Sequence, residues 1–243
     1  MGHIGLRGDR AGNIALHEAD LLLCIGTSLQ QQTVGYDPKV LAPNSRKFVI
    51  DFEGSVSKKN IPIEISEYID ADVTSVLEKL LELKVPARNA SEQNEEWISL
   101  NQKRKEVLSV AREPHYTSTD EINMYDFIDS LSEVSKEGDI IVTDAGLCFY
   151  IMGQAYLLKR NQRYIASGGL GSMGYAIPAS IGAAKVGNNR VICVTGDGSA
   201  QVNIQELATI ASNQSSIVIF IINNGGYASI RNTQKSFFSS EFI

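Results

Sequence analysis

The stretch GDGSAQVNIQELATIASNQSSIVIFIINNGGY, residues 196–227, contains the features that decide the predicted fold. It opens with an acidic glycine turn directly after one apolar run and closes with an asparagine pair directly after the next, residues 217–222. Between the two, apolar residues recur at spacings that mostly share one helical face, which predicts a helix over residues 199–212. Strand, helix and strand in this order are typical of a parallel sheet.

The same kind of apolar run occurs elsewhere in the chain. Runs rich in Val, Ile and Leu span residues 21–25, 47–52, 139–144, 190–196 and 217–222. They are apolar on both faces and lack alternation, which predicts central strands of parallel sheets covered by helices. A further helix is predicted over residues 121–134, with Ser118 and Glu121 as a capping box. We therefore expect α/β architecture in the form of doubly wound parallel sheets.

A change in composition divides the chain. Residues 86–120 are polar and rich in turn formers, with one amphipathic helix expected around residues 97–110. This stretch is interpreted as a linker between a first domain at residues 1–85 and a second at residues 121–243. Both domains are expected to be incomplete, the second being truncated at its C-terminus.

Composition excludes several classes of function. A net charge of −6 and a pI near 5.2 argue against nucleic-acid binding, which needs a concentrated basic face. Three widely spaced cysteines in apolar surroundings favour reduced thiols and hence a cytoplasmic location. The longest apolar run, residues 217–222, is far shorter than the roughly 20 residues that span a bilayer, so no membrane association is expected.

Polar turns follow three of the predicted strands: TDAG at residues 143–146, TGDGS at 195–199 and NNGG at 223–226. Open parallel sheets bind ligands beyond the carboxyl ends of their strands. A glycine turn that leads into a helix suits a phosphate, but Asp197 would repel a phosphate unless a cation lay between them. Asp197 and Asn224 offer the hard oxygen ligands that Mg²⁺ prefers. Either motif alone is more often an ordinary turn; the pair, 27 residues apart, favours a magnesium diphosphate site.

This pair of motifs resembles the signature of the thiamine-diphosphate-dependent enzymes. The resemblance implies that Asp197, the Asn224 side chain and the Gly226 carbonyl bind the metal, and that Gly198 and Ser199 hold the diphosphate. The segment SGGLGSMGYAIPASIGAA, residues 167–184, is similar to the acetolactate synthase branch. There the Gly171 carbonyl would accept from the cofactor's 4′-amino group and Met173 would bend the cofactor. The remaining cofactor contacts that the resemblance implies are Ala145, Gly146, Gly196 and Tyr227.

The first third of the chain resembles the middle domain of the same family. The resemblance covers residues 5–29, 49–53 and 58–81. Many members hold FAD or another nucleotide in this domain. The loop GTSLQQQTVG, residues 26–35, lacks the arginine that usually follows the glycine, which argues against flavin here.

The activity that the resemblance implies is decarboxylation of a 2-oxo acid, pyruvate being expected, with transfer of the acyl unit to an acceptor. Ile230 stands where simple pyruvate decarboxylases carry a Glu that protonates the product, which favours carboligation. Leu147 and Cys148 stand where many relatives have Gln and His, which weakens any inference about the substrate.

The Glu that activates the cofactor belongs, in this family, to an amino-terminal pyrimidine-binding domain of another subunit. We find no such domain in the sequence, so no catalytic side chain is expected in this chain, and the isolated chain is expected to bind the cofactor weakly and to be inactive. A fragment, a split subunit and a truncated gene product all fit this pattern. The expected partners are a pyrimidine-binding domain or subunit and, in the whole enzyme, further copies in a homo-oligomer, with apolar patches exposed where they bind.

Two other functions fit parts of the sequence. GLGSMG, residues 169–174, matches a dinucleotide-binding fingerprint, and Asp197 follows Gly174 by 23 residues, as a ribose-binding acid would. This reading predicts a nicotinamide-dependent oxidoreductase but leaves the NNGG turn without a role. A degenerate nucleotide-binding module without catalysis is the other alternative.

Overall fold

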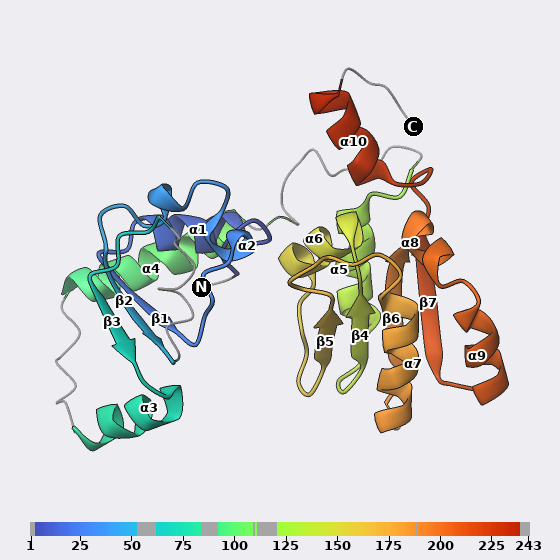
Figure 1. The fold of residues 1–243 in the computed structure, drawn as a ribbon, viewed down its shortest axis with the longest axis horizontal. Coiled ribbons are helices and arrows are strands. Elements are labelled where there is room, and N and C mark those ends of the chain that lie inside the picture. Colours follow the sequence, from blue (N-terminus) through green and yellow to red (C-terminus); the bar gives the residue numbers. More distant parts are fainter. Residues whose placement is uncertain are drawn as a thin grey trace. The chain divides into compact units, whose positions relative to one another are not determined.

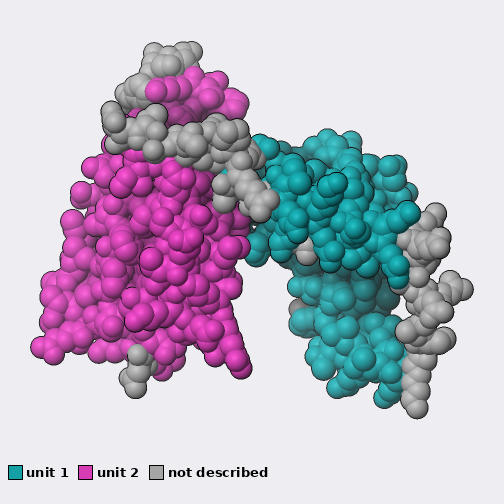
Figure 2. All heavy atoms as spheres, turned by 180° about the vertical axis from the view of Figure 1, so that it is seen from behind, with its two compact units in different colours: residues 1–113 teal, residues 114–243 magenta. Residues whose placement is uncertain are grey.

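The computed structural model describes residues 3–52, 62–83, 92–108, 110, 121–187 and 189–238. The chain divides into two compact units, residues 1–113 and 114–243 (Figures 1 and 2). Each unit has its own parallel sheet and its own hydrophobic core. The expected α/β fold with two parallel-sheet domains is therefore confirmed.

The first unit contains a three-stranded parallel sheet in the order β1-β2-β3. Its core gathers Cys24, Leu29, Val34, Leu41 and Val49. In chain order, its described elements are α1 (Arg10–His17), β1 (Leu21–Ile25), α2 (Gln31–Val34), the short 3₁₀ helix η1 (Pro38–Val40), β2 (Arg46–Asp51), β3 (Glu67–Asp70), α3 (Val73–Glu82) and α4 (Glu92–Val107).

The second unit contains a four-stranded parallel sheet in the order β5-β4-β6-β7. Because the order of the strands differs from their order in the chain, the helices cross over both faces of the sheet. In chain order, its described elements are α5 (Met124–Val134), β4 (Ile140–Thr143), α6 (Gly146–Ala155), β5 (Arg163–Ala166), α7 (Ala176–Val186), β6 (Val191–Gly196), α8 (Asp197–Val202), α9 (Glu206–Asn213), β7 (Ile217–Ile222) and α10 (Ala228–Phe237).

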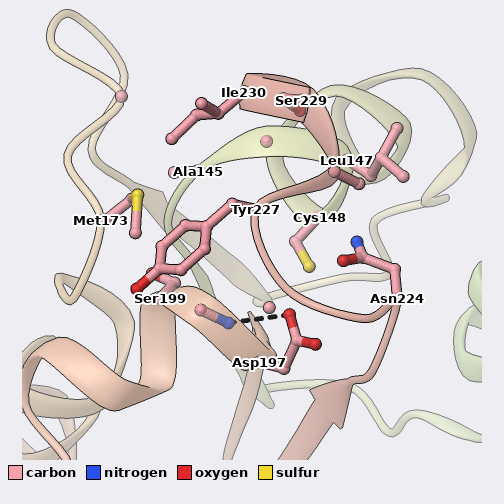
Figure 3. A pocket seen from close by; sticks show the side chains of 15 residues that line it. Ala145, Leu147, Cys148, Met173, Asp197, Ser199, Asn224, Tyr227, Ser229 and Ile230 are labelled. Carbon is pink, nitrogen blue, oxygen red and sulfur yellow. Dashed lines mark hydrogen bonds between the residues drawn. The ribbon is translucent and has the colours of Figure 1, made fainter. Parts of the chain in front are cut away.

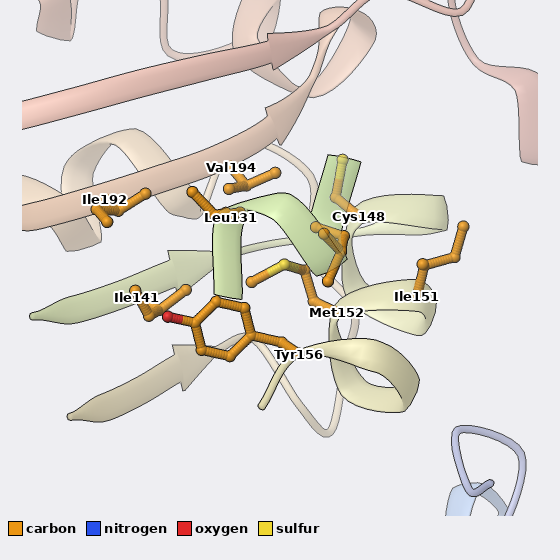
Figure 4. Close-up of a cluster of buried hydrophobic side chains, with 9 residues drawn as sticks. Leu131, Ile141, Cys148, Ile151, Met152, Tyr156, Ile192 and Val194 are labelled. Atoms are coloured by element: carbon orange, nitrogen blue, oxygen red, sulfur yellow. The ribbon is translucent and has the colours of Figure 1, made fainter. Parts of the chain in front are cut away.

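Side chains from alternate positions of β4 and β6 fill two cores, one on each face of this sheet. Ile141, Ile192 and Val194 pack with α5 and α6 on one face (Figure 4). Val142 and Cys193 pack with α7 on the other. Every described residue of β4 is buried, as the continuous apolar run predicted. The two central strands thus form a rigid base whose carboxyl ends carry the polar turns.

The prediction that all five apolar runs are buried on both faces is wrong for two of them. In β1, Leu21 and Leu23 are 59% and 49% exposed, and in β7 Val218 and Ile221 are 41% and 49% exposed. Both strands lie at an edge of their sheet. In β1 the exposed side chains share one face, whereas in β7 Val218 and Ile221 lie on opposite faces, so each face of β7 is only partly covered. Apolar composition alone does not distinguish an uncovered edge strand from a central one.

The predicted helix over residues 199–212 is two helices, α8 and α9, separated at residues 203–205. The break follows from the Asn203 side chain, whose Nδ2 donates to the Gly174 carbonyl at 2.7 Å. A Cβ atom on Gly174 would come within 2.7 Å of Val202, so the loop packs tightly on the end of α8. Tertiary contact, which periodicity does not report, interrupts the helix here.

Two further expectations about helices are corrected. The N-cap of α5 is Asn123, whose Oδ1 accepts from the Tyr125 N–H at 2.8 Å, so the helix begins beyond the expected capping box. Ser118 lies outside the described residues. The helix expected within the linker is α4, which contacts α1 and whose Arg104 pairs with Glu18, so it belongs with the first unit.

Candidate functional site

A cavity of about 180 Å³ lies in the second unit where the polar turns meet (Figure 3). All the predicted site residues except Gly226 line it. Its walls are formed by Ala145, Gly146, Leu147, Cys148, Gly171, Met173, Gly196, Asp197, Gly198, Ser199, Asn224, Tyr227, Ala228, Ser229 and Ile230. The turns after β4, β6 and β7 therefore converge on one place, as the carboxyl ends of parallel strands must.

Three helices begin at this cavity, and none is capped by the side chain of its own N-cap residue. α6 starts at Gly146, α8 at Asp197 and α10 at Ala228, and none has a hydrogen bond from its N-cap side chain. The first N–H groups of a helix lack intrahelical partners and carry partial positive charge. Convergence of three such ends makes the cavity suitable for an anion with several oxygens.

Asp197 joins two of the converging turns. Its Oδ1 accepts from the Gly198 N–H at 2.8 Å, which Figure 3 shows, and its Oδ2 accepts from the Gly226 N–H at 2.7 Å. Each carboxylate oxygen has a second lone pair left over. The carboxylate can therefore hold the asparagine turn in place and still bind a cation.

Asn224 points its side chain into the same cavity (Figure 3). Its Oδ1 is buried, and no hydrogen-bond donor within the described ranges reaches it. A buried acceptor without a hydrogen-bond partner lowers the stability of the fold by about 1–3 kcal/mol. Such an atom is therefore a candidate to bind a ligand or ion. The position of this oxygen in the wall that also holds Asp197 fits a shared cation.

The asparagine turn has an unusual backbone. Gly225, Gly226 and Tyr227 have φ values of 77°, 79° and 49°, three left-handed residues in succession. A non-glycine residue such as Tyr227 takes this conformation only where surrounding contacts require it. The Tyr227 ring packs so closely on Gly198 that a Cβ atom there would lie 2.9 Å from it.

Arg231 binds the carbonyls of this turn, which the sequence did not indicate. Its guanidinium donates to the carbonyls of Asn224 at 2.9 Å and of Gly225 at 2.5 Å, and also to that of Gly226. The Gly226 carbonyl, expected as a metal ligand, is therefore already bound by a cationic side chain in this structure. No feature of the local sequence predicts that a residue in the first turn of α10 folds back in this way.

Ser199 is placed in the cavity, but its hydroxyl is already used. The hydroxyl donates to Asp144 Oδ2 at 2.5 Å and accepts from the Gly174 N–H at 2.7 Å. A contact from Ser199 to a diphosphate would therefore come from its backbone N–H. Asp144 lies within the TDAG turn but was not among the predicted site residues.

The remaining wall of the cavity is apolar and neutral. Met173 and Tyr227 lie on one side of it, with Leu147 across from them (Figure 3). Burial raises the pKa of the Cys148 thiol to about 12, and the negative charges of Asp144 and Asp197 act in the same direction. Cys148 therefore stays a neutral thiol at physiological pH. Leu147, Cys148, Ala228, Ser229 and Ile230 complete the wall and were not among the predicted contacts.

The structure argues against the dinucleotide fingerprint at residues 169–174. In that motif the acidic residue ends the strand that lies next to the strand before the glycines. Here the glycines follow β5, whereas Asp197 follows β6, and β4 lies between these two strands. Asp197 is therefore not placed to bind the ribose of a nucleotide held by the GLGSMG loop.

Within the described ranges, no three His, Cys, Asp or Glu side chains gather into a metal-binding cluster. An ion in the cavity would thus depend on one carboxylate together with amide or carbonyl oxygens, a set that suits Mg²⁺ rather than a transition metal. Among the described helices, none has the length and apolar character needed to cross a membrane.

A parallel sheet whose carboxyl edge carries three helix N-termini, the Asp197 carboxylate and an unpartnered amide oxygen is typical of α/β domains that bind a ligand at that edge. Comparison with known families makes the assignment specific. Residues 144–243 match the model described as "Thiamine pyrophosphate enzyme, C-terminal TPP binding domain". Residues 1–80 match "Thiamine pyrophosphate enzyme, central domain". The chain belongs to the thiamine pyrophosphate enzyme family.

Comparison with individual proteins shows which members of this family the chain is similar to. The chain is 32% identical to acetolactate synthase isozyme 1 large subunit of Escherichia coli, over 98% of this chain and 41% of that protein. It is 31% identical to the acetolactate synthase large subunit of Cyanidium caldarium, over 100% of this chain and 40% of that protein. It is 32% identical to the acetolactate synthase large subunit of Lactococcus lactis, over 98% of this chain and 40% of that protein. The chain thus spans about two fifths of the length of these curated relatives.

Proposed function

We propose that this chain is part of a carboligase that depends on thiamine diphosphate and Mg²⁺ and is similar to acetolactate synthase. Such an enzyme decarboxylates a 2-oxo acid, here pyruvate, and transfers the acyl unit to an acceptor. The observation that carries the proposal is the buried, unpartnered Oδ1 of Asn224 in the cavity that also contains Asp197. The similarity to acetolactate synthase large subunits supports the choice of reaction.

The residues of the cavity fit a magnesium diphosphate. Asp197 and Asn224 supply two hard oxygens, and phosphate oxygens and water would complete the octahedron that Mg²⁺ requires. The Gly226 carbonyl is a third ligand once it is released from Arg231. The uncapped N-terminal ends of α6, α8 and α10 would receive the phosphate oxygens.

When bound, thiamine diphosphate supplies the carbon nucleophile and the electron sink that decarboxylation of a 2-oxo acid needs. This chain's own residues orient that group. Gly171, with φ of 61°, and the half-buried Met173 line the wall that would face its pyrimidine ring, where the Gly171 carbonyl can accept a hydrogen bond. Positioning of this kind lowers a barrier without any acid or base on the chain.

Few groups in the cavity could transfer a proton to a substrate. Apart from Asp197, the walls contain no carboxylate, and the Cys148 thiol is neutral because its pKa is raised to about 12. Ile230 lines the cavity and is 48% exposed. A Glu at this position could protonate the product and would favour simple decarboxylation. An apolar residue here keeps a proton donor away from the reacting carbon, which favours its capture by a second carbonyl compound.

The proposal includes a partner that covers the cavity. Two apolar side chains in or next to its lining are exposed: Tyr227 is 48% exposed, and Leu170, which precedes the lining residue Gly171, is 91% exposed. Exposed apolar groups beside a polar site are typical of a protein interface. We propose that a pyrimidine-binding domain or subunit, which carries the activating Glu, binds here in a cytoplasmic homo-oligomer. Flavin is not part of the proposal, because the loop at residues 26–35 contains no arginine.

A thermal-shift assay tests this function against the alternatives. A ligand that binds only the folded state stabilises it, by about 2.7 kcal/mol at a ligand concentration 100 times the dissociation constant. The melting temperature rises as a result. Millimolar thiamine diphosphate with Mg²⁺ should stabilise the wild-type chain but not Asp197→Ala. Stabilisation by NAD alone would favour an oxidoreductase, and no response to either ligand would favour a module without catalysis.

A further inference from the structure

Asp144, directly after β4, is a fully buried carboxylate with 0% of its surface exposed. It does not line the cavity itself but lies directly before Ala145, which does. Its Oδ2 accepts from Thr195 Oγ1 at 2.8 Å, from Ser199 Oγ at 2.5 Å and from the Ala176 N–H at 3.4 Å. Its Oδ1 accepts from the Ala145 N–H at 2.8 Å. Within the described part of the chain, each of these partners is a neutral donor.

The donors come from different segments that meet at the site. Ala145 precedes α6, Ala176 begins α7, Thr195 lies at the end of β6 and Ser199 lies in α8. The network extends further, because Ser199 Oγ accepts from the Gly174 N–H at 2.7 Å. The Asp144 carbonyl also accepts from Ser167 Oγ at 3.1 Å. One residue therefore connects the turn after β4, the glycine loop before α7 and the turn after β6.

A carboxylate can accept all the hydrogen bonds at this position, whereas an amide could not. Four donors converge on its two oxygens, and an ionised carboxylate is the side chain that only accepts. An amide of the same shape would turn an NH₂ group against at least one of these donors. Hydrogen bonds to a charged group are also stronger than neutral ones, so the arrangement that they fix is stiff.

We infer that Asp144 is a positioning residue, which sets the relative placement of the glycine loop at residues 167–174 and the turn at residues 196–199. It acts through Ser199, whose hydroxyl donates to it and accepts from the Gly174 N–H. The consequence for cofactor binding rests on the proposed function, because both segments carry the residues proposed to hold thiamine diphosphate. The placement itself is a property of the ligand-free chain.

Asp144→Asn tests the inference, with Asp139→Asn as a matched control. Asp139 is also a buried carboxylate, 4% exposed, but it precedes β4 at the opposite end of the strand and pairs with Arg190 at 2.5 Å. Both substitutions should lower the melting temperature. Only Asp144→Asn should speed amide hydrogen exchange at Gly174 and Ala176, by at least tenfold, in the ligand-free chain, measured by NMR below both melting temperatures.

Affinity gives the second readout. Asp144→Asn should weaken binding of thiamine diphosphate with Mg²⁺ at least tenfold, measured by calorimetry, whereas Asp139→Asn should leave it within twofold of wild type. Should Asp144→Asn not fold, Ser199→Ala replaces it: exchange at Gly174 should rise, while Thr195→Val, which removes a donor outside the link to Gly174, should leave that amide unchanged.

Unchanged exchange at Gly174 and Ala176 in Asp144→Asn, or equal changes in Asp139→Asn, would overturn the inference. Failure of the wild-type chain to bind thiamine diphosphate would count against the proposed function instead. The exchange experiment would still decide the role of Asp144, because it needs no ligand.

Discussion

The Asp197 carboxylate accepts a hydrogen bond from the Gly226 N–H at 2.7 Å, so the turn after β6 directly holds the turn after β7. The two motifs lie far apart in the chain, yet a single side chain connects them. The connection also brings the Asn224 amide to the cavity that Asp197 lines. This contact is the structural basis for proposing one shared cation.

Asp197→Ala should have two separable effects. Loss of the hydrogen bonds to Gly198 and Gly226 should lower the free energy of unfolding of the ligand-free chain by about 1–3 kcal/mol. Loss of the charge should also remove the Mg²⁺-dependent part of stabilisation by thiamine diphosphate. Urea denaturation with and without Mg²⁺ measures both. A variant that keeps the full Mg²⁺ response would exclude Asp197 as a ligand.

Asn224→Leu should behave differently. Because Asn224 Oδ1 is buried without a partner, its replacement by a similar apolar side chain should leave the ligand-free chain as stable as wild type or more stable. Stabilisation by thiamine diphosphate with Mg²⁺ should nevertheless be lost. Asn224→Asp, which keeps an oxygen at this position, is the control and should retain it. Lower stability of ligand-free Asn224→Leu would mean that the amide already has a structural role.

Arg231→Met should increase the affinity for Mg²⁺ in the presence of thiamine diphosphate. In the ligand-free structure the Arg231 guanidinium binds the Gly226 carbonyl, which is the proposed third metal ligand. A positive charge next to this ligand repels a divalent cation and so opposes its binding. Arg231→Lys retains the charge and should stay closer to wild type. Titration with Mn²⁺, followed by electron paramagnetic resonance of the free ion, gives the dissociation constants. Weaker binding by Arg231→Met would show instead that the side chain supports the turn in its ligand-binding form.

The cysteine in the cavity wall makes stability depend on alkaline pH. Burial raises the pKa of Cys148 to about 12, whereas an unfolded thiol titrates near 8.5. The unfolded chain therefore loses this proton first, so the contribution is present below about pH 8.5 and is lost as the pH rises towards 12. Between pH 8 and 10 the free energy of unfolding should fall by about 1–2 kcal/mol less in Cys148→Ala than in wild type. Equal slopes would contradict the raised pKa.

Much of the fold follows from local patterns. The apolar runs give the positions of β1, β2, β4, β6 and β7 to within one residue, since a buried parallel strand needs a continuous apolar segment. The short strands β3 and β5 were not among them, because each has polar or aromatic residues in a brief edge position. The partial exposure of β1 and β7 depends on what covers the edge of each sheet, which no single run contains.

The site is predictable where chemistry resides in a short motif and not where it depends on tertiary contact. The motifs around Asp197 and Asn224 placed the cavity, because strand order brings their turns together. The hydrogen bonds of Asp144 and the fold-back of Arg231 onto the Gly226 carbonyl join residues whose spacing has no recognised pattern. The motif likewise does not show that the Ser199 hydroxyl is bound to Asp144, which lies 55 positions earlier in the chain.

The central claim is that one divalent ion binds both Asp197 and Asn224 and carries a diphosphate. Anomalous diffraction from crystals grown with thiamine diphosphate and Mn²⁺ tests it most directly, because the signal locates the ion itself. The account predicts one strong peak within bonding distance of a carboxylate oxygen of Asp197 and of Asn224 Oδ1, with diphosphate oxygens in the same coordination shell. Diphosphate density in the cavity without such a peak, or an ion bound away from either side chain, would contradict it.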